Sequence, residues 1–299
     1  MRTKENTLVS VVLPTFNRGH IIELSIRSVL AQTYNNLEVI VIDDASTDDT
    51  EKKIEELNDS RIKYLKLKEN VGASAARNKG ISLARGIFVA FQDSDDIWFP
   101  KKIERQIDSY NDMYNRYKTV AGCFCRYIKI SGNNGTNVVP LSSDLLANDG
   151  NYHEKLLNRN LIGTPTLLAK KEALDKVGGF DSSLSTDEDW DLALKLTKLY
   201  RFALTDEILV CSLTSSDGVN TKPRSESILK IIQNNIDSFD KNKKCYSLQI
   251  RTAAIDCLMR NNISEAIKLA KRSLMIRPSV KSLLIFLVPN IYIKIKKFK

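Results

Sequence analysis

A run of acidic residues in the middle of the chain suits metal-assisted phosphate chemistry. Asp93 and Asp95 lie two positions apart in the segment Asp93-Ser94-Asp95-Asp96. Residues i and i+2 of an extended segment project to the same side, so both carboxylates can offer hard oxygen ligands to one cation. Mg²⁺ or Mn²⁺ held by only one or two carboxylates keeps coordination positions open for phosphate oxygens. Taken alone, an Asp-x-Asp pair is more typical of a solvated acidic turn.

A second group of residues suits the recognition of a nucleotide. Asp44 can accept a hydrogen bond from the imide N–H of a nucleobase, with Asp43 supporting it, although a carboxylate here can equally cap a loop or a helix. Arg77 would put a guanidinium beside phosphates, and Gly72 would permit close approach of the backbone; the alternative is an arginine on the surface of an amphipathic helix. Neither glycine-rich dinucleotide pattern nor P-loop pattern occurs in the sequence, so the nucleotide site is predicted to be of another kind.

Two further carboxylates begin a predicted helix near the end of the main body. The segment STDEDWDLALKL places Glu188 and Asp189 at the start of a helix that spans residues 188–199. Acidic residues in a first turn stabilise a helix through its dipole, which is one sufficient explanation. The other is catalysis, because a carboxylate in a cleft can take the proton from an attacking hydroxyl.

The elements that must position these residues form an alternating pattern. Short, β-branched-rich runs at residues 8–13, 37–42, 62–67 and 87–91 predict buried parallel strands, with helical spacing between them. Strand–helix–strand units of this length predict a parallel sheet with right-handed crossovers, and ligands bind beyond the carboxyl ends of its strands. The candidate residues that follow these strands, or begin the next helix, are Pro14, Thr15, Asn17, Asp43, Asp44, Arg77, Asp93 and Asp95.

The rest of the chain predicts a mixed region followed by helices. A helix over residues 101–117 precedes a strand over 119–130, which turns back at 133–135 into a second strand. A strand near 164–169 and a helix ending at Gly178-Gly179 follow. From residue 225 onward the pattern is helical only. We therefore predict an α/β domain over residues 1–220 and a helical C-terminal appendage over residues 221–299.

Charge is distributed unevenly between these two parts. Of the 45 basic and 36 acidic residues, 17 basic and 5 acidic fall in residues 221–299, so this part carries +12 and the main body −3. This distribution argues against nucleic acid as a partner and favours an anionic membrane surface for the tail, whose last residues include Lys294, Lys296, Lys297 and Lys299. The alternative is a terminal helix packed on the body. With no apolar leader or spanning segment, a cytoplasmic position at the inner face of the membrane is expected.

Several of these segments together resemble the inverting family 2 glycosyltransferases. The resemblance covers roughly residues 8–213 and implies the nucleotide-diphospho-sugar transferase (GT-A) fold, a mostly parallel central sheet flanked by helices. It also implies a nucleotide-sugar donor, a divalent metal, and direct displacement at the anomeric carbon by an acceptor hydroxyl. The segments that carry it, in order, are VSVVLPTFNR, LEVIVIDDASTDDT, NVGASAARNKG, FQDSDDIWFP, VGGFD and STDEDWDLALKL.

The resemblance implies a role for each of the candidate side chains. Asp44 would read the base, Arg77 would lie near the donor, and Asp95 would be the principal metal ligand with Asp93 assisting. Asp189 would be the catalytic base, with Glu188 as its neighbour. The Gln-x-x-Arg-Trp motif of processive synthases is absent, so one sugar per acceptor is expected. The predicted reaction is transfer from a UDP-sugar to a lipid-linked or surface-polysaccharide acceptor.

Two alternatives to this prediction remain open. A nucleotidyltransferase would also use a metal and a related sheet. It needs an N-terminal loop rich in glycine and basic residues to bind a triphosphate, and no such loop is seen in the sequence. A membrane-associated binding or scaffold protein could keep the same fold without turnover. Clustered carboxylates at Asp93, Asp95 and Asp189 argue against the scaffold, because mutually repelling charges have no use in a chain without chemistry.

Overall fold

The computed structural model describes residues 7–131, 135–140, 149–214 and 223–289. The chain forms two compact units, each made of several chain segments. The first unit comprises Met1–His153, Leu161–Ser182 and Lys195–Val219. The second comprises Glu154–Asn160, Ser183–Leu194 and Asn220–Lys299. The second unit thus combines its long C-terminal segment with two short segments from the main body.

The first unit contains a sheet whose first half is parallel. Strands β1 (Val9–Thr15), β2 (Leu37–Asp43), β3 (Ile62–Lys66) and β4 (Phe88–Phe91) lie in the order β3-β2-β1-β4. The register pairs Val9 with Leu37 and with Phe88, so the carboxyl ends of β1, β2 and β4 meet at one edge. Strands β1, β2 and β4 confirm the α/β prediction, because their runs of apolar and β-branched residues are buried on both faces. The prediction of a buried strand at residues 62–67 is wrong in one respect: β3 lies at the edge of the sheet, and its residues are partly buried or exposed.

The other half of the sheet is mixed. It continues from β4 through β8 (Leu167–Lys170), β6 (Val120–Ser131), β9 (Arg201–Thr214) and β5 (Asp96–Trp98), while β7 (Gly135–Val139) pairs with β6 as the predicted hairpin. The turn predicted at residues 133–135 lies mostly outside the described residues. The sequence pattern does not predict β5 and β9: β5 has three residues, and β9 carries charged side chains, among them Asp206 and Glu207.

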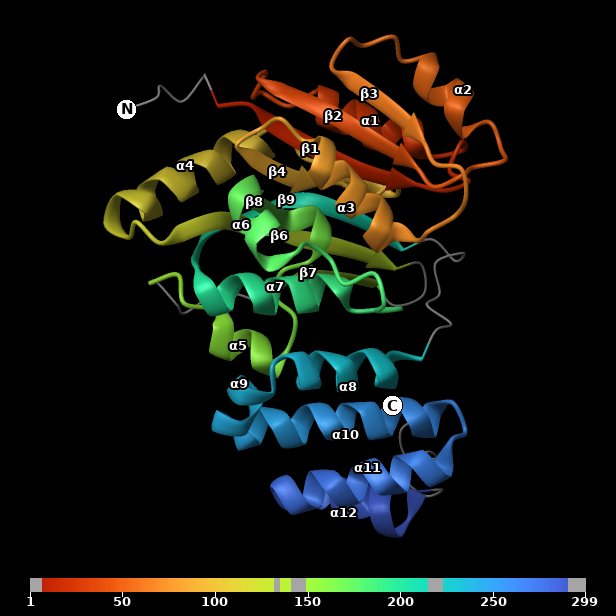
Figure 1. Cartoon of the computed structure of the whole chain (residues 1–299), viewed down its shortest axis with the longest axis vertical. Helices are drawn as coiled ribbons and strands as arrows, with labels where there is room; N and C mark the ends of the chain where they lie inside the picture. Colours follow the sequence, from red (N-terminus) through yellow and green to blue (C-terminus); the bar gives the residue numbers. More distant parts are fainter. Residues whose placement is uncertain (1–6, 132–134, 141–148, 215–222, 290–299) are drawn as a thin grey trace. The chain divides into compact units, whose positions relative to one another are not determined.

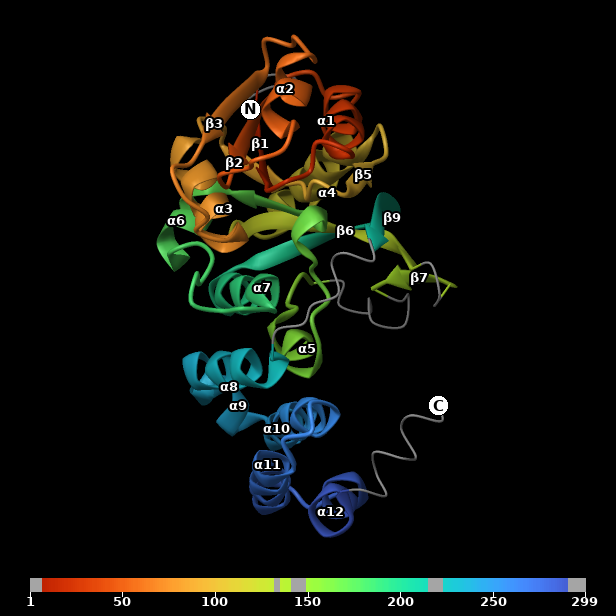
Figure 2. The ribbon, with the colours of Figure 1, turned by 90° about the vertical axis from the view of Figure 1, so that its right-hand side faces the viewer.

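Helices cover both faces of the parallel strands. On one face α1 (Ile22–Leu30), α2 (Thr50–Glu55) and α4 (Lys102–Arg116) share a core with alternate β1 residues such as Val11. On the opposite face lies α3 (Ala73–Leu83), and Figure 2 shows α1 and α3 on opposite sides of the β1–β2 pair. A Cβ atom added at Gly80 of α3 would lie 2.3 Å from Cγ1 of Val12. The absence of a side chain at Gly80 therefore lets α3, which carries Arg77, lie close against the sheet.

Three short helices and α7 lie between β7 and β9 along the chain. They are α5 (His153–Asn158), the 3₁₀ helix η3 (Thr164–Thr166) and α6 (Lys171–Val177). Helix α6 ends at Gly178, whose φ of 77° is the left-handed conformation that closes many helices. Helix α7 (Glu188–Leu199) has the bounds that the sequence predicts. Its first seven residues belong to the second unit and the rest to the first.

The second unit consists mainly of packed helices, as predicted for the C-terminal part. Figure 1 shows α8 (Arg224–Asn234), α10 (Lys243–Met259), α11 (Ile263–Ile276) and α12 (Val280–Leu287) stacked one upon another, with the short α9 (Ile236–Lys241) between α8 and α10. The side chains of Asn242, Asn262 and Ser279 cap α10, α11 and α12. Among the described residues, no helix combines the length and apolar character that crossing a membrane requires. The predicted tail lysines Lys294, Lys296, Lys297 and Lys299 lie outside the described residues.

Candidate functional site

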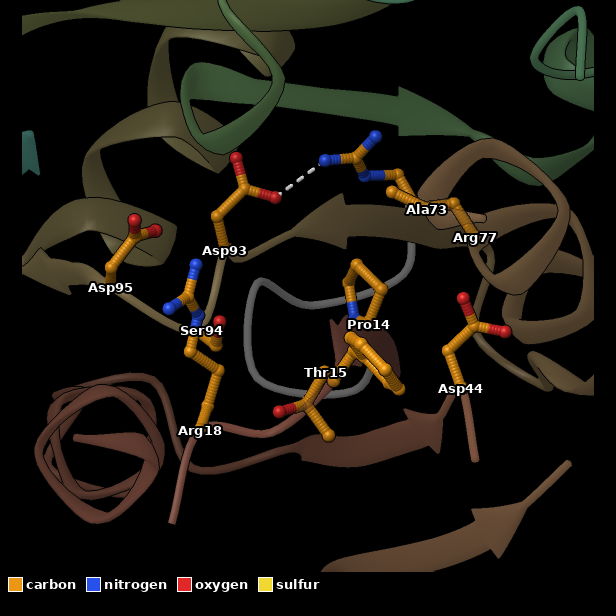
Figure 3. Close-up of a pocket in the computed structure, with 10 residues that line it drawn as sticks. Pro14, Thr15, Arg18, Asp44, Ala73, Arg77, Asp93, Ser94 and Asp95 are labelled. Atoms are coloured by element: carbon orange, nitrogen blue, oxygen red, sulfur yellow. Dashed lines mark hydrogen bonds and ion pairs between the residues drawn. The ribbon is translucent and has the colours of Figure 1, made fainter. Parts of the chain in front are cut away.

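A pocket of about 260 Å³ opens at the carboxyl edge of the parallel strands. Residues from four separate parts of the chain meet there: the end of β1, the loop after β2, the first turns of α3, and the loop after β4. Figure 3 shows the polar side chains arranged around the pocket, with Asp44 at one end and Asp95 at the other. The lining residues are Pro14, Thr15, Phe16, Arg18, Asp44, Ala73, Arg77, Asp93, Ser94 and Asp95. Six of the eight predicted donor-site residues are among them.

Asp44 holds the loop that leads into α3. Its Oδ1 accepts a hydrogen bond from the backbone N–H of Val71 at 2.8 Å, and its Oδ2 accepts one from Gly72 at 2.8 Å. The carboxylate is only 4% exposed, and it still lines the pocket. Gly72 has φ +87°, a conformation that side chains disfavour. Each carboxylate oxygen has a further lone pair, so Asp44 can hold this loop and accept a hydrogen bond from a ligand.

Asp43 and Asn17, two of the predicted donor-site residues, support the pocket from outside its lining. Asp43 is fully buried and accepts hydrogen bonds from the backbone N–H of Ser46 and from the hydroxyl of Tyr64. Burial and the Asp43 carboxylate together raise the pKa of Tyr64 far above its ordinary value. Asn17, with φ +51°, accepts a hydrogen bond from Thr47 N, and its own N–H donates to Ser46 Oγ. These bonds tie the loop after β1 to the loop after β2.

Arg77 and Asp93 form an ion pair across the pocket. The Nη2 of Arg77 lies 2.7 Å from Oδ1 of Asp93, and Figure 3 shows the Asp93 carboxylate turned toward Arg77. The Arg77 side chain is 7% exposed, and its guanidinium lies 5.3 Å from the centre of the Phe180 ring. Asn78, the next residue of α3, exchanges two hydrogen bonds with the backbone of Phe180. Arg77 is thus held in place and presents its charge to the pocket.

The carboxylates after β4 repel one another. Burial, and then the charge of Asp93, raise the pKa of Asp95 above its ordinary value, while Arg18 and Arg77 partly offset the effect. Burial and the same neighbour raise the pKa of Asp96 much further, and Asp96 hydrogen-bonds Ser212 on the adjacent strand β9. A positive charge placed among these carboxylates would therefore be stabilised strongly.

The residues present fit a divalent cation that is shared with a ligand. Asp93 and Asp95 both line the pocket and supply hard oxygen donors at one end of it. In the part of the chain that the structure describes, no three His, Cys, Asp or Glu side chains gather as a metal site. Two carboxylates are what Mg²⁺ or Mn²⁺ takes from a protein when phosphate oxygens and water complete its coordination. The chemistry of the donor set thus suits the predicted cation.

Four lining residues are missing from the predicted donor site: Phe16, Arg18, Ala73 and Ser94. Arg18 is the most consequential of them, because it is a second cation that acts on Asp95. Its place directly after Asn17, in the segment that follows the first predicted strand, is a usable sequence signal. Ala73 and Ser94 contribute small surfaces that no side-chain chemistry distinguishes in the sequence.

The predicted catalytic carboxylates belong to the second unit. Glu188 and Asp189 open α7, and both are partly exposed. Oδ1 of Asp189 accepts a hydrogen bond from the backbone N–H of Trp190 at 2.7 Å. Trp190 is 1% exposed, and its indole N–H donates to the carbonyl of Leu156 in α5 at 2.7 Å. A buried tryptophan therefore anchors the helix start directly next to Asp189.

Two solved structures show the same fold. Residues 1–349 of S. aureus TarS in complex with UDP-GlcNAc superimpose with a TM-score of 0.59 at 18% identity, over 93% of this chain and 78% of that one. The mannosyltransferase PcManGT from Pyrobaculum calidifontis, in complex with GDP-Man and Mn²⁺, gives a TM-score of 0.61 at 16% identity, over 97% and 83% of the two chains. The predicted GT-A fold is confirmed.

Relatives in sequence lead to the same family. The Escherichia coli protein WfgD, a UDP-Glc:α-D-GlcNAc-diphosphoundecaprenol β-1,3-glucosyltransferase, is 45% identical over 121 residues, which are 39% of this chain and 48% of WfgD. The matches to the first two curated relatives span 36% and 48% of their lengths. The family model for glycosyl transferase family 2 matches residues 10–163, just over half of the chain. The chain therefore belongs to glycosyl transferase family 2.

Proposed function

We propose that this chain transfers one sugar from a UDP-sugar to a hydroxyl of a lipid-linked or surface-polysaccharide acceptor, with inversion at the anomeric carbon. The observation that carries the proposal is the arrangement of the pocket. A buried carboxylate that can accept from a base lies at one end, a pair of carboxylates lies at the other, and Arg18 and Arg77 are available for phosphates. Such a pocket suits a nucleoside diphosphate lying along the carboxyl edge of the sheet.

The two ends of the pocket would perform different tasks in donor binding. Asp44 would accept the imide N–H of uracil while it keeps its hydrogen bonds to Val71 and Gly72. Arg18 and Arg77 would bind the diphosphate. WfgD is a UDP-Glc-dependent glucosyltransferase by name, and TarS is seen with UDP-GlcNAc, which supports UDP over other nucleotides.

Asp95, assisted by Asp93, would hold Mg²⁺ or Mn²⁺ in the presence of the donor. The cation would supply neutralisation of the negative charge that develops on the diphosphate as it leaves. The Mn²⁺ in the PcManGT complex supports this proposal. Before donor binding, Arg77 already neutralises part of the charge on Asp93. When the donor binds, Arg77 would exchange its contact with Asp93 for contacts with the diphosphate, and Asp93 would then be available to the cation. Binding of the cation and binding of the diphosphate would therefore both depend on Arg77.

Asp189 would remove the proton from the acceptor hydroxyl as that oxygen attacks the sugar, with Glu188 as its neighbour. A single displacement with one general base inverts the anomeric centre. Asp189 suits the role because it is partly exposed and can reach a ligand, while Trp190 fixes the backbone directly after it. The name of WfgD specifies a diphosphoundecaprenol acceptor, which supports a lipid-linked acceptor here.

The C-terminal helices would hold the protein at the cytoplasmic face of an anionic membrane. Apolar side chains on α11 and α12 are exposed to a degree unusual for a soluble surface: Met275 is 80% exposed, Val280 74% and Leu287 61%. Exposed basic residues accompany them, among them Lys271, Arg277 and Lys281. A helix surface that is apolar with basic flanks binds anionic headgroups and the acyl boundary together.

Binding to vesicles tests this membrane proposal. Val280→Ser combined with Leu287→Ser should weaken partition of the full chain onto phosphatidylglycerol vesicles, whereas Met259→Ser should not. Met259 is 50% exposed on α10 and serves as a matched control. Equal partition of the double variant and the unaltered chain would contradict the membrane proposal.

Calorimetry of nucleotide binding tests the transferase proposal. The titrations use UDP, GDP, CMP and dTDP with and without Mn²⁺, on the wild-type protein and on Asp95→Asn. We expect selective, Mn²⁺-dependent binding of UDP that Asp95→Asn loses. UDP-Glc and UDP-GlcNAc are the first donors to test for turnover with a GlcNAc-diphospho-lipid acceptor. Release of pyrophosphate from a nucleoside triphosphate would instead identify a nucleotidyltransferase.

A further inference from the structure

The segment that carries Asp189 is built into the helices of the second unit. The backbone N–H of Thr186 donates to Ser227 Oγ of α8 at 3.2 Å. The Nε2 of Gln249, on α10, donates to the carbonyls of Leu157 and Asn158 at the end of α5, the same helix to which the Trp190 indole is bonded. Residues 183–194 therefore belong to the same compact unit as the C-terminal helices.

Arg224 makes the strongest of these connections. Its Nη2 lies 2.6 Å from Oδ1 of Asp187 and its Nε donates to Oδ2 at 2.7 Å, so the guanidinium grips the carboxylate with two parallel bonds. Asp187 has φ +58° and is not a glycine, so the backbone just before α7 is held in a conformation that costs free energy. Thr186 Oγ1 donates to the same carboxylate. The ion pair holds Asp187 in this conformation.

The start of α8, where Arg224 lies, is fixed by a residue of α10. Oδ2 of Asp256 accepts hydrogen bonds from the backbone N–H groups of Arg224 at 3.0 Å and of Ser225 at 2.9 Å. Because these are the first two residues of α8, the position of the helix start, and with it the base of the Arg224 side chain, is determined by α10. A continuous set of bonds thus runs from α10 through Arg224 to Asp187, two residues before Asp189.

The charge of Arg224 also acts on Asp189 itself. The hydrogen bonds to Asp187 raise the pKa of Arg224, and the charges of Asp187, Asp189 and Asp256 add to that effect. The interaction is mutual, so the guanidinium favours the ionised form of Asp189. The other charged side chains of the segment, Asp187, Glu188 and Asp191, are acidic, whereas the neighbouring helices carry both signs: Glu226 and Lys230 on α8, and Lys243, Lys244, Arg251 and Asp256 on α10. Arg224 is the basic group that is bonded to Asp187, so a neutral residue in its place would make the surroundings of Asp189 more negative and disfavour its ionised form relative to the wild-type protein.

We propose that Arg224 of the C-terminal helices is a positioning residue for the general base: its two bonds to Asp187 fix the backbone that leads to Asp189, and they place a positive charge beside that segment. This inference rests on the proposed function, in which Asp189 is the base. It gives the helical appendage a part in the reaction that is separate from any contact with a membrane. Arg224 does not touch the substrate in this proposal; it acts only through Asp187 and Asp189.

The test compares Arg224→Gln and Arg224→Lys with the matched control Arg260→Gln. Arg260 pairs with Asp256, at 3.4 Å, so its replacement removes one arginine from the same group of helices and leaves the two-bond contact of Arg224 with Asp187 in place. The readouts are the pH profile of kcat/KM for whichever of UDP-Glc and UDP-GlcNAc the wild-type protein turns over, UDP affinity by calorimetry, and the thermal unfolding midpoint.

We expect Arg224→Gln to lower kcat/KM by about 10²-fold, the cost of a small misplacement of a catalytic group. The acid limb of its pH profile should move up by about one pH unit, because removing a nearby positive charge raises the pKa of a carboxylate. Arg224→Lys should return the limb toward its wild-type position while kcat/KM stays below wild type, since an ammonium restores the charge without the two-bond grip. Arg260→Gln should match wild type, and UDP affinity should be unchanged in all three variants.

The outcomes separate this inference from the proposed function. If Asp189→Asn abolishes turnover but Arg224→Gln keeps the wild-type pH profile, the positioning role is refuted and the base assignment stands. If Asp189→Asn keeps full turnover, the base assignment fails and the inference falls with it. If Arg224→Gln does not fold, wild-type kcat/KM in Arg224→Lys refutes the role, because an ammonium cannot reproduce the two-bond grip on Asp187.

Discussion

Glu38 offers a quantitative test of how the sheet is held together away from the site. It is the second residue of β2, at the end of the strand opposite Asp43, and it is 3% exposed. Its carboxylate accepts hydrogen bonds from Ser10 Oγ at 2.7 Å, from Lys63 Nζ at 2.7 Å, and from the backbone and side chain of Arg85 at 2.9 and 3.0 Å. The bonds join β2 to β1, to β3 and to the approach to β4.

The expected effect follows from the pKa of this carboxyl. Burial alone would raise the pKa of Glu38, but the hydrogen bonds from Lys63, Ser10 and Arg85 outweigh it and lower the pKa from 4.5 to about 2. One pKa unit corresponds to about 1.4 kcal/mol, which gives about 3 kcal/mol of folding free energy. The side chains of Lys63 and Arg85 are 43% and 66% exposed, so solvent screening reduces the expected contribution to about 2 kcal/mol.

The sign of the pH dependence follows from a folded-state pKa that is lower than the unfolded one. The contribution is fully present above pH 4.5 and is lost as the pH falls toward 2. Glu38→Gln cannot ionise, so its deficit in stability should be about 2 kcal/mol at pH 6, and less than half of that should be left at pH 3.

Urea unfolding at pH 6 and pH 3 measures this difference. Glu23→Gln is the control: Glu23 pairs with Arg27 on the surface of α1, with 44% and 61% of the two side chains exposed, and should change stability by less than about 1 kcal/mol. Because Glu38 lies at the amino end of β2, its replacement should leave UDP affinity at pH 7 unchanged. An equal deficit at both pH values would refute the reasoning.

Three further predictions concern the pocket and the helix beside it. Asp44→Asn should weaken UDP binding by about tenfold or more in calorimetry, because an amide cannot accept from both Val71 N and Gly72 N and from a base; unchanged affinity would contradict the role of Asp44. Gly80→Ala should lower stability by about 1–3 kcal/mol in thermal unfolding, since its Cβ would lie 2.3 Å from a methyl of Val12, and the additional change Val12→Ala should recover part of the loss. Gly72→Ala should also destabilise, by about 1–2 kcal/mol, but through backbone conformation alone, because no atom lies within 4 Å of the added carbon; Val12→Ala should therefore not rescue it.

The parallel half of the fold was predictable because three of its four strands, β1, β2 and β4, are buried on both faces. Such strands must be continuously apolar, and residues 8–13, 37–42 and 87–91 nearly are. The predicted helix bounds at α7 also agree with the structure. Strand β9 was not predicted from the sequence. It pairs with β6 through register irregularities near Arg126, and exposed charged residues at this point interrupt the alternation of apolar and polar residues. A period of two is not visible across such breaks.

The candidate site was predictable where side-chain chemistry and position coincide. Asp44, Arg77, Asp93 and Asp95 line the pocket because the ends of parallel strands meet at one edge. Asp43 follows the same rule of position but points into the interior, toward Tyr64, because consecutive side chains leave a strand on opposite sides. The ion pair of Arg77 with Asp93 joins residues 16 apart along the chain, and no sequence pattern distinguishes it from two separate ligand contacts.

The membership of residues 183–194 in the helical unit has a consequence for exchange and truncation of the chain. A cut at residue 220, where the sequence suggests a clean boundary, would remove Ser227 and Arg224 and leave Thr186 and Asp187 without the groups that bind them. Grafting the appendage of a relative onto residues 1–220 would meet the same obstacle, because two segments of the main body, residues 154–160 and 183–194, belong to one compact unit with this appendage. In a chimeric protein, the segment around Asp189 and the C-terminal helices would have to come from the same parent. The residues of the donor pocket could come from a different parent.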